Sequence, residues 1–199
     1  MAPNKKLDLA AEQSLLEQCQ RQDIEAFAKI VDAYQVRVLG FVRRMVPDHE
    51  EALDVTQEVF IRAFQSLDRF DGRCSLRTWM FRVAHNLCID RARRAKRAPV
   101  AMSLDAGFES SEPIEFSDER WDPAQMAMNA ELQAEVGRAI SSMSDKLRIV
   151  LLLHDKEDMG YDEIAGIVGI PVGTVKSRLL LARRHLQEQL SQYLEREKS

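Results

Sequence analysis

Two clusters of basic side chains carry the strongest chemical signal in this 199-residue sequence. Between Arg69 and Ala98, nine bases stand against two acids. In the second cluster, no acid occurs between Thr174 and Gln187, and the bases are Lys176, Arg178, Arg183 and Arg184. One basic run alone would be typical of a solvated helix end. Two such runs indicate phosphate neutralisation on a nucleic-acid duplex.

These clusters are hidden in the overall composition, which is acidic. The chain has 28 Lys and Arg against 32 Asp and Glu, a net charge of −4. Residues 99–128 contain seven acids, one base and three prolines, so we interpret residues 98–129 as a flexible acidic linker between two helical regions. With 45% apolar and 30% charged residues the chain is globular, which excludes collagen, mucin and a long coiled coil.

Membrane insertion and export are not expected from the sequence. The longest strongly apolar run, residues 149–153, is five residues long, whereas a bilayer span needs about 20. Carboxylates interrupt the first twelve residues where a secretory signal would need an apolar stretch. We therefore expect a soluble, cytoplasmic protein.

The cysteines do not form a metal-binding or disulfide pattern. Cys19, Cys74 and Cys88 are odd in number and contain no CxxC pair, which favours reduced thiols. His85 and Cys88 lie three residues apart, but no second pair of ligands is nearby, as a structural zinc site would require. No metal and no cofactor are expected.

Helical periodicity accounts for most of the chain, and no alternating strand pattern is found. Apolar residues recur three or four apart, and Ser75 is a plausible N-cap. The helices expected on this basis are residues 23–46, 53–67, 75–97, 130–143 and 145–155. The fold class is therefore predicted to be all-α.

Residues 161–178 predict a helix-turn-helix. A helix of about eight residues should end at Gly169, Pro171 should end the turn, and a second helix should begin near Gly173. Helical hairpins of this kind also occur in proteins that never bind DNA. The flanking bases favour DNA, with Lys176 and Arg178 near the start of the helix that would enter the major groove.

Several motifs together resemble a bacterial RNA polymerase sigma factor of the extracytoplasmic-function (ECF) class of the sigma-70 family. This class keeps only the second and fourth conserved sigma regions. The motifs are EALDVTQEVF at residues 51–60, FDG at 70–72, RTWMFRVAHN at 77–86, DRARR at 90–94 and, within residues 161–184, VGTVKSR at 172–178. The matches cover roughly residues 20–97 and 130–190.

The resemblance implies two small helical domains. A lead-in of residues 1–22 precedes a region 2 domain at residues 23–97, and a region 4 domain at residues 130–194 follows the linker. The implied partners are core RNA polymerase, through its β′ clamp and β subunits, promoter DNA and an anti-sigma factor, without direct membrane insertion. The implied role is non-enzymatic: promoter-specific initiation and help in opening the duplex, serving a stress or envelope-response regulon.

The resemblance also assigns site residues by their place in the motifs. Those implied to bind core polymerase are Asp54, Gln57, Glu58, Ile61, Arg62 and Gln65. Those implied to bind the minus-10 element are Phe70, Trp79, Phe81, Arg82, Asn86, Arg91, Arg93 and Arg94. Those implied to bind the minus-35 element are Thr174, Lys176, Ser177, Arg178 and Arg184. Trp79 shares an apolar side with Met80 and Val83 and also suits a place in the core.

The chain departs from the family pattern at two positions. Leu180 and Leu181 stand where some members place an aromatic residue and an arginine, which leaves the DNA sequence that is read open. Acidity alone suggests the hypothesis that the linker occupies the basic RNA-exit path.

The alternative function is a stand-alone helix-turn-helix regulator with a helical N-terminal domain. A helical-bundle enzyme is disfavoured, because there is no Glu-x-x-His pair, nucleophile motif or phosphate loop.

Overall fold

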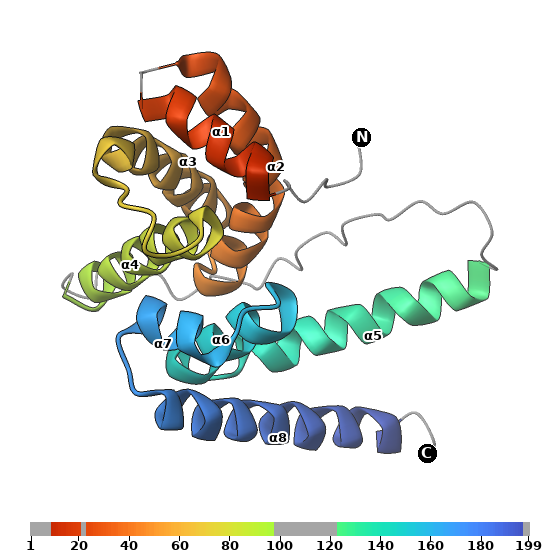
Figure 1. Cartoon of the computed structure of the whole chain (residues 1–199). Coiled ribbons are helices and arrows are strands. Elements are labelled where there is room, and N and C mark those ends of the chain that lie inside the picture. Colours follow the sequence, from red (N-terminus) through yellow and green to blue (C-terminus); the bar gives the residue numbers. More distant parts are fainter. Residues whose placement is uncertain (1–8, 21–22, 98–122, 197–199) are drawn as a thin grey trace. The chain divides into compact units, whose positions relative to one another are not determined.

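The computed structural model describes residues 9–20, 23–97 and 123–196, all of which belong to helices or to the short turns between them (Figure 1). The all-α prediction is confirmed for this part of the chain. Residues 98–122 of the proposed linker lie outside the described residues, whereas its last part, residues 123–129, is helical. Contacts divide the chain into one unit of residues 1–99 and 159–170 and another of residues 100–158 and 171–199. The predicted domain boundaries stay predictions.

The first unit begins with α1 (Leu9–Gln20), a helix that the periodicity did not predict. Among the side chains of this helix that the structure describes, the buried apolar groups are Leu15 and Cys19, so its pattern is weak. Glu12 accepts a 2.8 Å hydrogen bond from the hydroxyl of Tyr34, which ties α1 to the next helix. Burial and this bond raise the pKa of Tyr34.

Local capping sets the starts of the next three helices, α2 (Ile24–Met45), α3 (His49–Ser66) and α4 (Leu76–Arg97). Asp23 accepts hydrogen bonds from the first-turn amides of α2, and Asp48 does the same for α3. Ser75 accepts from the amide of Thr78, as the sequence predicted. Because Asp48 is the cap, α3 begins earlier than the apolar pattern at Leu53 suggested.

The core of the first unit lies where α2, α3 and α4 pack on one another, closed at one end by the 3-10 turn η1 (Leu67–Arg69). Phe81 of α4 meets Phe41 of α2 edge to face, with ring centroids 5.4 Å apart. His85, one turn further along α4, is also buried. Burial, with Arg93 as a lesser cause, lowers its pKa from 6.5 to about 4.

The short helix α7 (Tyr161–Val168) also packs on α4 within the first unit. Its Glu163 accepts a 2.6 Å hydrogen bond from the hydroxyl of Thr78 and a 3.0 Å bond from the amide of Gly160. Burial alone would raise the pKa of Glu163, but these bonds and the charge of Arg77 hold it below its ordinary value. Gly169, at φ 72°, ends α7 in the left-handed conformation, as predicted.

The second unit comprises α5 (Pro123–Ser141), α6 (Asp145–Leu151), the π-helical turn η2 (Leu152–Lys156) and α8 (Val172–Arg196). Helices α5 and α6 both pack on α8 (Figure 1). The buried stripe of α8 consists of Val175, Leu179 and Ala182.

A buried arginine fastens the end of α5 to α6. Arg148 donates hydrogen bonds to the carbonyl oxygens of Ile140 at 3.0 Å, Ser141 at 2.6 Å and Met143 at 2.7 Å. Ile140 and Ser141 lie in the last turn of α5, where carbonyls have no partner within the helix, and Met143 follows that turn. Burial lowers the pKa of Arg148 and Asp145 opposes the shift.

The end of the predicted helix 145–155 is wound as a π-helix rather than an α-helix. The turn places Asp155 beside Arg183 of α8, with a hydrogen bond of 2.7 Å between Nη2 and Oδ1. Burial would raise the pKa of Asp155, but hydrogen bonds from Arg183 and His154 lower it. Arg183 therefore joins η2 to α8.

Among the described residues, no single helix is both long enough and apolar enough to cross a membrane. Helices α7 and α8 pass such a test only when a bent pair of helices is counted as one span.

Candidate protein and nucleic-acid interfaces

One face of α3 carries all six side chains that the sequence assigned to core polymerase. Asp54, Gln57, Glu58, Ile61, Arg62 and Gln65 recur at spacings of three and four residues, so they share one side of the helix. We call this set the α3 face. The opposite side, with Ala52, Val59 and Ala63, is fully buried. Ile61 is 50% exposed and is the one large apolar side chain in the set.

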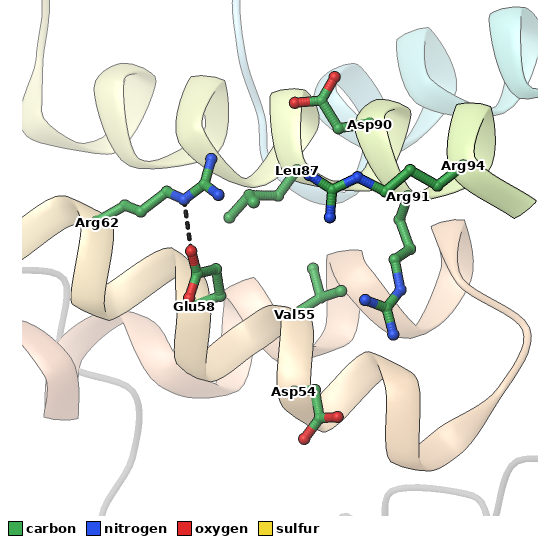
Figure 2. Close-up of a pocket in the computed structure, with 8 residues that line it drawn as sticks. All are labelled: Asp54, Val55, Glu58, Arg62, Leu87, Asp90, Arg91 and Arg94. Atoms are coloured by element: carbon green, nitrogen blue, oxygen red, sulfur yellow. Dashed lines mark hydrogen bonds and ion pairs between the residues drawn. The ribbon is translucent and has the colours of Figure 1, made fainter.

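A pocket of about 320 Å³ lies between the α3 face and α4 (Figure 2). It is lined by acids and bases around two apolar side chains, namely Asp54, Val55, Glu58, Arg62, Leu87, Asp90, Arg91 and Arg94. Glu58 and Arg62 form an ion pair of 2.6 Å whose side chains are about half exposed. Exposed pairs of this kind stabilise a protein by less than about 1 kcal/mol, so a partner exchanges them at small cost.

Arg91, assigned from the sequence to the minus-10 element, is engaged elsewhere. Its Nε donates to Glu51 of α3, and the resulting ion pair links the two helices beside the pocket. Figure 2 shows the side chain reaching from α4 toward α3. The structure thus gives Arg91 a role in positioning α3 against α4. Arg91 and Glu51 are 40 residues apart, so local spacing in the sequence did not indicate their contact.

Four of the predicted minus-10 residues come together at one side of α4. Trp79, Arg82 and Asn86 recur at spacings of three and four residues, and Phe70 from the preceding loop packs against Trp79 with ring centroids 5.4 Å apart. We call this set the aromatic face. Phe70 and Trp79 are half-buried and Asn86 is exposed. Gly72, at φ 71°, turns the chain between Phe70 and α4.

The assignment of Phe81 to DNA is wrong. Its side chain is 0% exposed and packs on Phe41, so no base can reach it without unfolding of the core. The motif places Phe81 two residues from Trp79, which turns it to the opposite side of the helix. Trp79 lies at the edge of the core rather than within it.

The predicted phosphate-binding arginines of α4 differ in accessibility. Arg93 and Arg94 are exposed, and Arg93 makes only a 3.9 Å contact with Asp90. Arg82 is half-buried, and within the described residues its Nε is buried without a hydrogen-bond partner. Among the predicted arginines of α4 whose side chains the structure describes, Arg93 and Arg94 are therefore the accessible ones.

The outward face of α8 brings the predicted minus-35 residues together. Lys176, Ser177 and Arg184 are exposed, whereas Thr174 and Arg178 are half-buried at its edges. Arg184 pairs with Glu188 at 3.1 Å in an exposed i, i+4 contact. We call the side opposite the buried stripe the α8 outer face; it carries Gly173, Ser177, Leu180, Leu181 and Arg184 and is bordered by Thr174, Lys176 and Arg178.

Sequence reasoning did not find two features of α8. Arg183 belongs to the basic cluster by sequence but is held by Asp155, a contact over 28 residues that no local spacing indicates. The exposure of Leu180, at 71%, was not anticipated either, whereas Leu181, which is 54% exposed, was expected on the outside of this helix. The exposure of both leucines could have been predicted from their spacing, because neither lies three or four residues from a member of the buried stripe of α8.

Comparisons with known proteins agree in assigning both halves of the chain. The Sigma-70 region 2 family matches residues 30–98, and the Sigma-70, region 4 family matches residues 133–186. RNA polymerase sigma-H factor of Pseudomonas aeruginosa is 34% identical over 187 residues, covering 92% of this chain and 95% of that protein. ECF RNA polymerase sigma-E factor of Escherichia coli K12 is 34% identical over 189 residues, covering 93% and 97%.

Solved structures show the same fold. A sigma factor RpoE from Bartonella quintana, solved with the anti-sigma factor NepR, aligns with a TM-score of 0.69 at 21% identity, covering 84% of this chain and 98% of that one. CnrH, solved with the cytosolic domain of CnrY, aligns with a TM-score of 0.63 at 24% identity, covering 91% and 97%. At these identities the likeness concerns the fold alone.

Proposed function

We propose which residues carry out each step of transcription initiation, given that this chain belongs to the ECF class of the sigma-70 family. As a member of that family it is a transcription initiation factor and not an enzyme. It binds core RNA polymerase and directs initiation at promoters carrying minus-35 and minus-10 elements. Family membership favours this function over that of a stand-alone regulator.

The α3 face is the docking surface for core polymerase. The main support for the proposal is that the predicted residues share this face. All six residues share one exposed side of a helix inside the region 2 match. Ile61 supplies an apolar anchor, and Asp54 and Glu58 supply carboxylates for charge-assisted bonds to basic side chains. The adjacent pocket admits side chains of the β′ clamp between α3 and α4.

The aromatic face captures the minus-10 element during strand separation. An unstacked base is stabilised by stacking on an aromatic ring and by hydrogen bonds to its edge. Phe70 and Trp79 supply the rings, and the exposed amide of Asn86 supplies both a donor and an acceptor. Arg93 and Arg94 hold backbone phosphates nearby.

The α8 outer face binds the minus-35 element in the major groove. Lys176, Arg178 and Arg184 provide cations for guanine edges and phosphates, and the hydroxyls of Thr174 and Ser177 stand beside them. Ser177 already donates to the carbonyl of Thr174 at 3.1 Å, so its oxygen is directed along the helix rather than turned into the core.

An anti-sigma factor regulates the chain, and the protein acts in the cytoplasm, where core polymerase is found. Two structural relatives were solved with partners of this kind or with a cytosolic partner domain. The regulon concerns stress or the cell envelope, in line with the family resemblance. The alternating charges of the pocket offer such a partner the same contacts as core polymerase.

Reconstitution with core RNA polymerase on a promoter library tests these assignments. We expect Asp54→Ala to weaken core binding, whereas Lys176→Ala and Arg178→Ala keep core binding and lose initiation. Matched controls are Asp32→Ala and Lys29→Ala, exposed charges on α2 that lie outside the three surfaces. If all three variants behave like the controls, the assignments are refuted. If the unaltered protein shifts a palindromic operator without core enzyme, the stand-alone regulator is the better account.

A further inference from the structure

The α8 outer face carries two exposed apolar side chains, which is unusual for a helix surface made for phosphates. Leu180 is 71% exposed and Leu181 is 54% exposed. A single exposed leucine needs no explanation, but these two are adjacent in sequence and flank Arg184 on the same side of the helix. The buried stripe of Val175, Leu179 and Ala182 lies on the opposite side, so the two leucines do not serve the packing of α8 on α5 and α6.

The charged side chains around Leu180 and Leu181 indicate what kind of molecule these leucines contact. From Val172 to Gln187 the helix has four bases and no acid. One of the four, Arg183, is held by Asp155, which leaves Lys176, Arg178 and Arg184 around the leucines. Exposed apolar side chains that alternate with cations match the major groove, where phosphates flank base edges and the thymine methyl is the apolar group that the bases present.

We propose that Leu180 and Leu181 select thymine in the minus-35 element through contact with its C5-methyl group. This inference rests on the proposed function of the α8 outer face. A leucine side chain offers no hydrogen-bond donor, so a guanine at the same position would lose water from N7 and O6 without a replacement partner. The two leucines therefore favour thymine and also disfavour guanine.

The test removes only the methyl group. A minus-35 element is first selected from a promoter library by transcription with the reconstituted holoenzyme. Each thymine of that element is then replaced singly by deoxyuridine, which keeps every hydrogen-bonding group. We expect one or two positions at which deoxyuridine lowers promoter affinity about fourfold, the factor that corresponds to burial of one methyl-sized group.

The leucines are then removed in the same assay. In Leu180→Ala and Leu181→Ala, thymine and deoxyuridine should be bound equally at the position that each leucine contacts. Both side chains are exposed, so alanine leaves the core intact and raises helix propensity slightly. Leu132→Ala, at a 42% exposed leucine of α5, is the matched control and should keep the full preference for thymine.

Several results would contradict the inference and leave the proposed function intact. The first is a selected minus-35 element that contains no thymine. The second is a promoter affinity that deoxyuridine changes at no position. The third is a preference for thymine that persists when both leucines are alanine. A loss of initiation in the leucine variants that is equal on thymine and deoxyuridine templates would also overturn it, because it would assign the leucines to a protein partner. If the unaltered holoenzyme selects no promoter at all, the proposed function itself fails.

Discussion

Replacement of Arg148 by methionine should unfold the second unit more easily than any surface change. The guanidinium donates to three carbonyls at the end of α5, and the bonds to Ile140 and Met143 are buried. Methionine keeps much of the length and the apolar stem but donates nothing. Each buried carbonyl left without a donor costs about 1–3 kcal/mol. The Met143 carbonyl loses its donor, whereas the Ile140 carbonyl keeps a 3.2 Å bond from the amide of Met143, so we expect a loss of about 1–3 kcal/mol in the free energy of unfolding.

Hydrogen exchange of the full chain measures this loss where it arises. Amides of α5 and α6 in Arg148→Met should exchange faster by a factor of about 30, which corresponds to about 2 kcal/mol. Amides of α2 and α3, in the other unit, should not change. The control is Arg138→Met, because Arg138 is an exposed arginine of α5 whose ion pair with Glu135 is on the surface.

The reasoning on Arg148 would be refuted if Arg148→Met and Arg138→Met exchanged alike. It would also be refuted if Arg148→Lys were fully stable, since one ammonium group does not match the geometry of three carbonyls that the planar guanidinium serves. As a functional consequence, Arg148→Met should lower initiation at promoters that depend on the minus-35 element while core binding through α3 persists.

Two further predictions concern α4. Phe81→Leu should leave promoter opening unchanged, because Phe81 is a core side chain, whereas Phe70→Leu should reduce it in a permanganate footprint; equal loss from both would restore Phe81 to the DNA interface. His85 has a folded-state pKa of about 4 against 6.5 unfolded, so the unfolded chain binds the extra proton and stability falls as pH drops through this window. Urea titrations should show a loss of roughly 2–3 kcal/mol between pH 7 and pH 4.5 that His85→Gln removes, and equal loss in both proteins would contradict the assignment.

The location of most helices follows from the sequence because capping and apolar periodicity are local. Asp23 and Ser75 fix the starts of α2 and α4 through bonds to amides two or three residues away. Gly169 ends α7 because its backbone takes the left-handed conformation. The grouping of the α3 face follows equally from spacing, since residues three and four apart lie on one side of any helix.

Other features required the folded chain. Helix α1 escaped prediction because its burial depends on α2, including the bond from Tyr34 to Glu12, rather than on a strong pattern of its own. Phe81 was assigned to DNA because a motif names residue types without their direction, and only packing on Phe41 shows which side faces inward.

The sequence by itself determined the family, the all-helical architecture and the residues from which each surface is made, because these depend on residue type and on spacing along one helix. The tertiary structure decided which of those residues are available to a partner. Arg91 and Arg183 form ion pairs with carboxylates 40 and 28 residues away, and Phe81 is buried against Phe41. Such contacts join groups distant in the chain, and their free energy depends on geometry that exists only after folding.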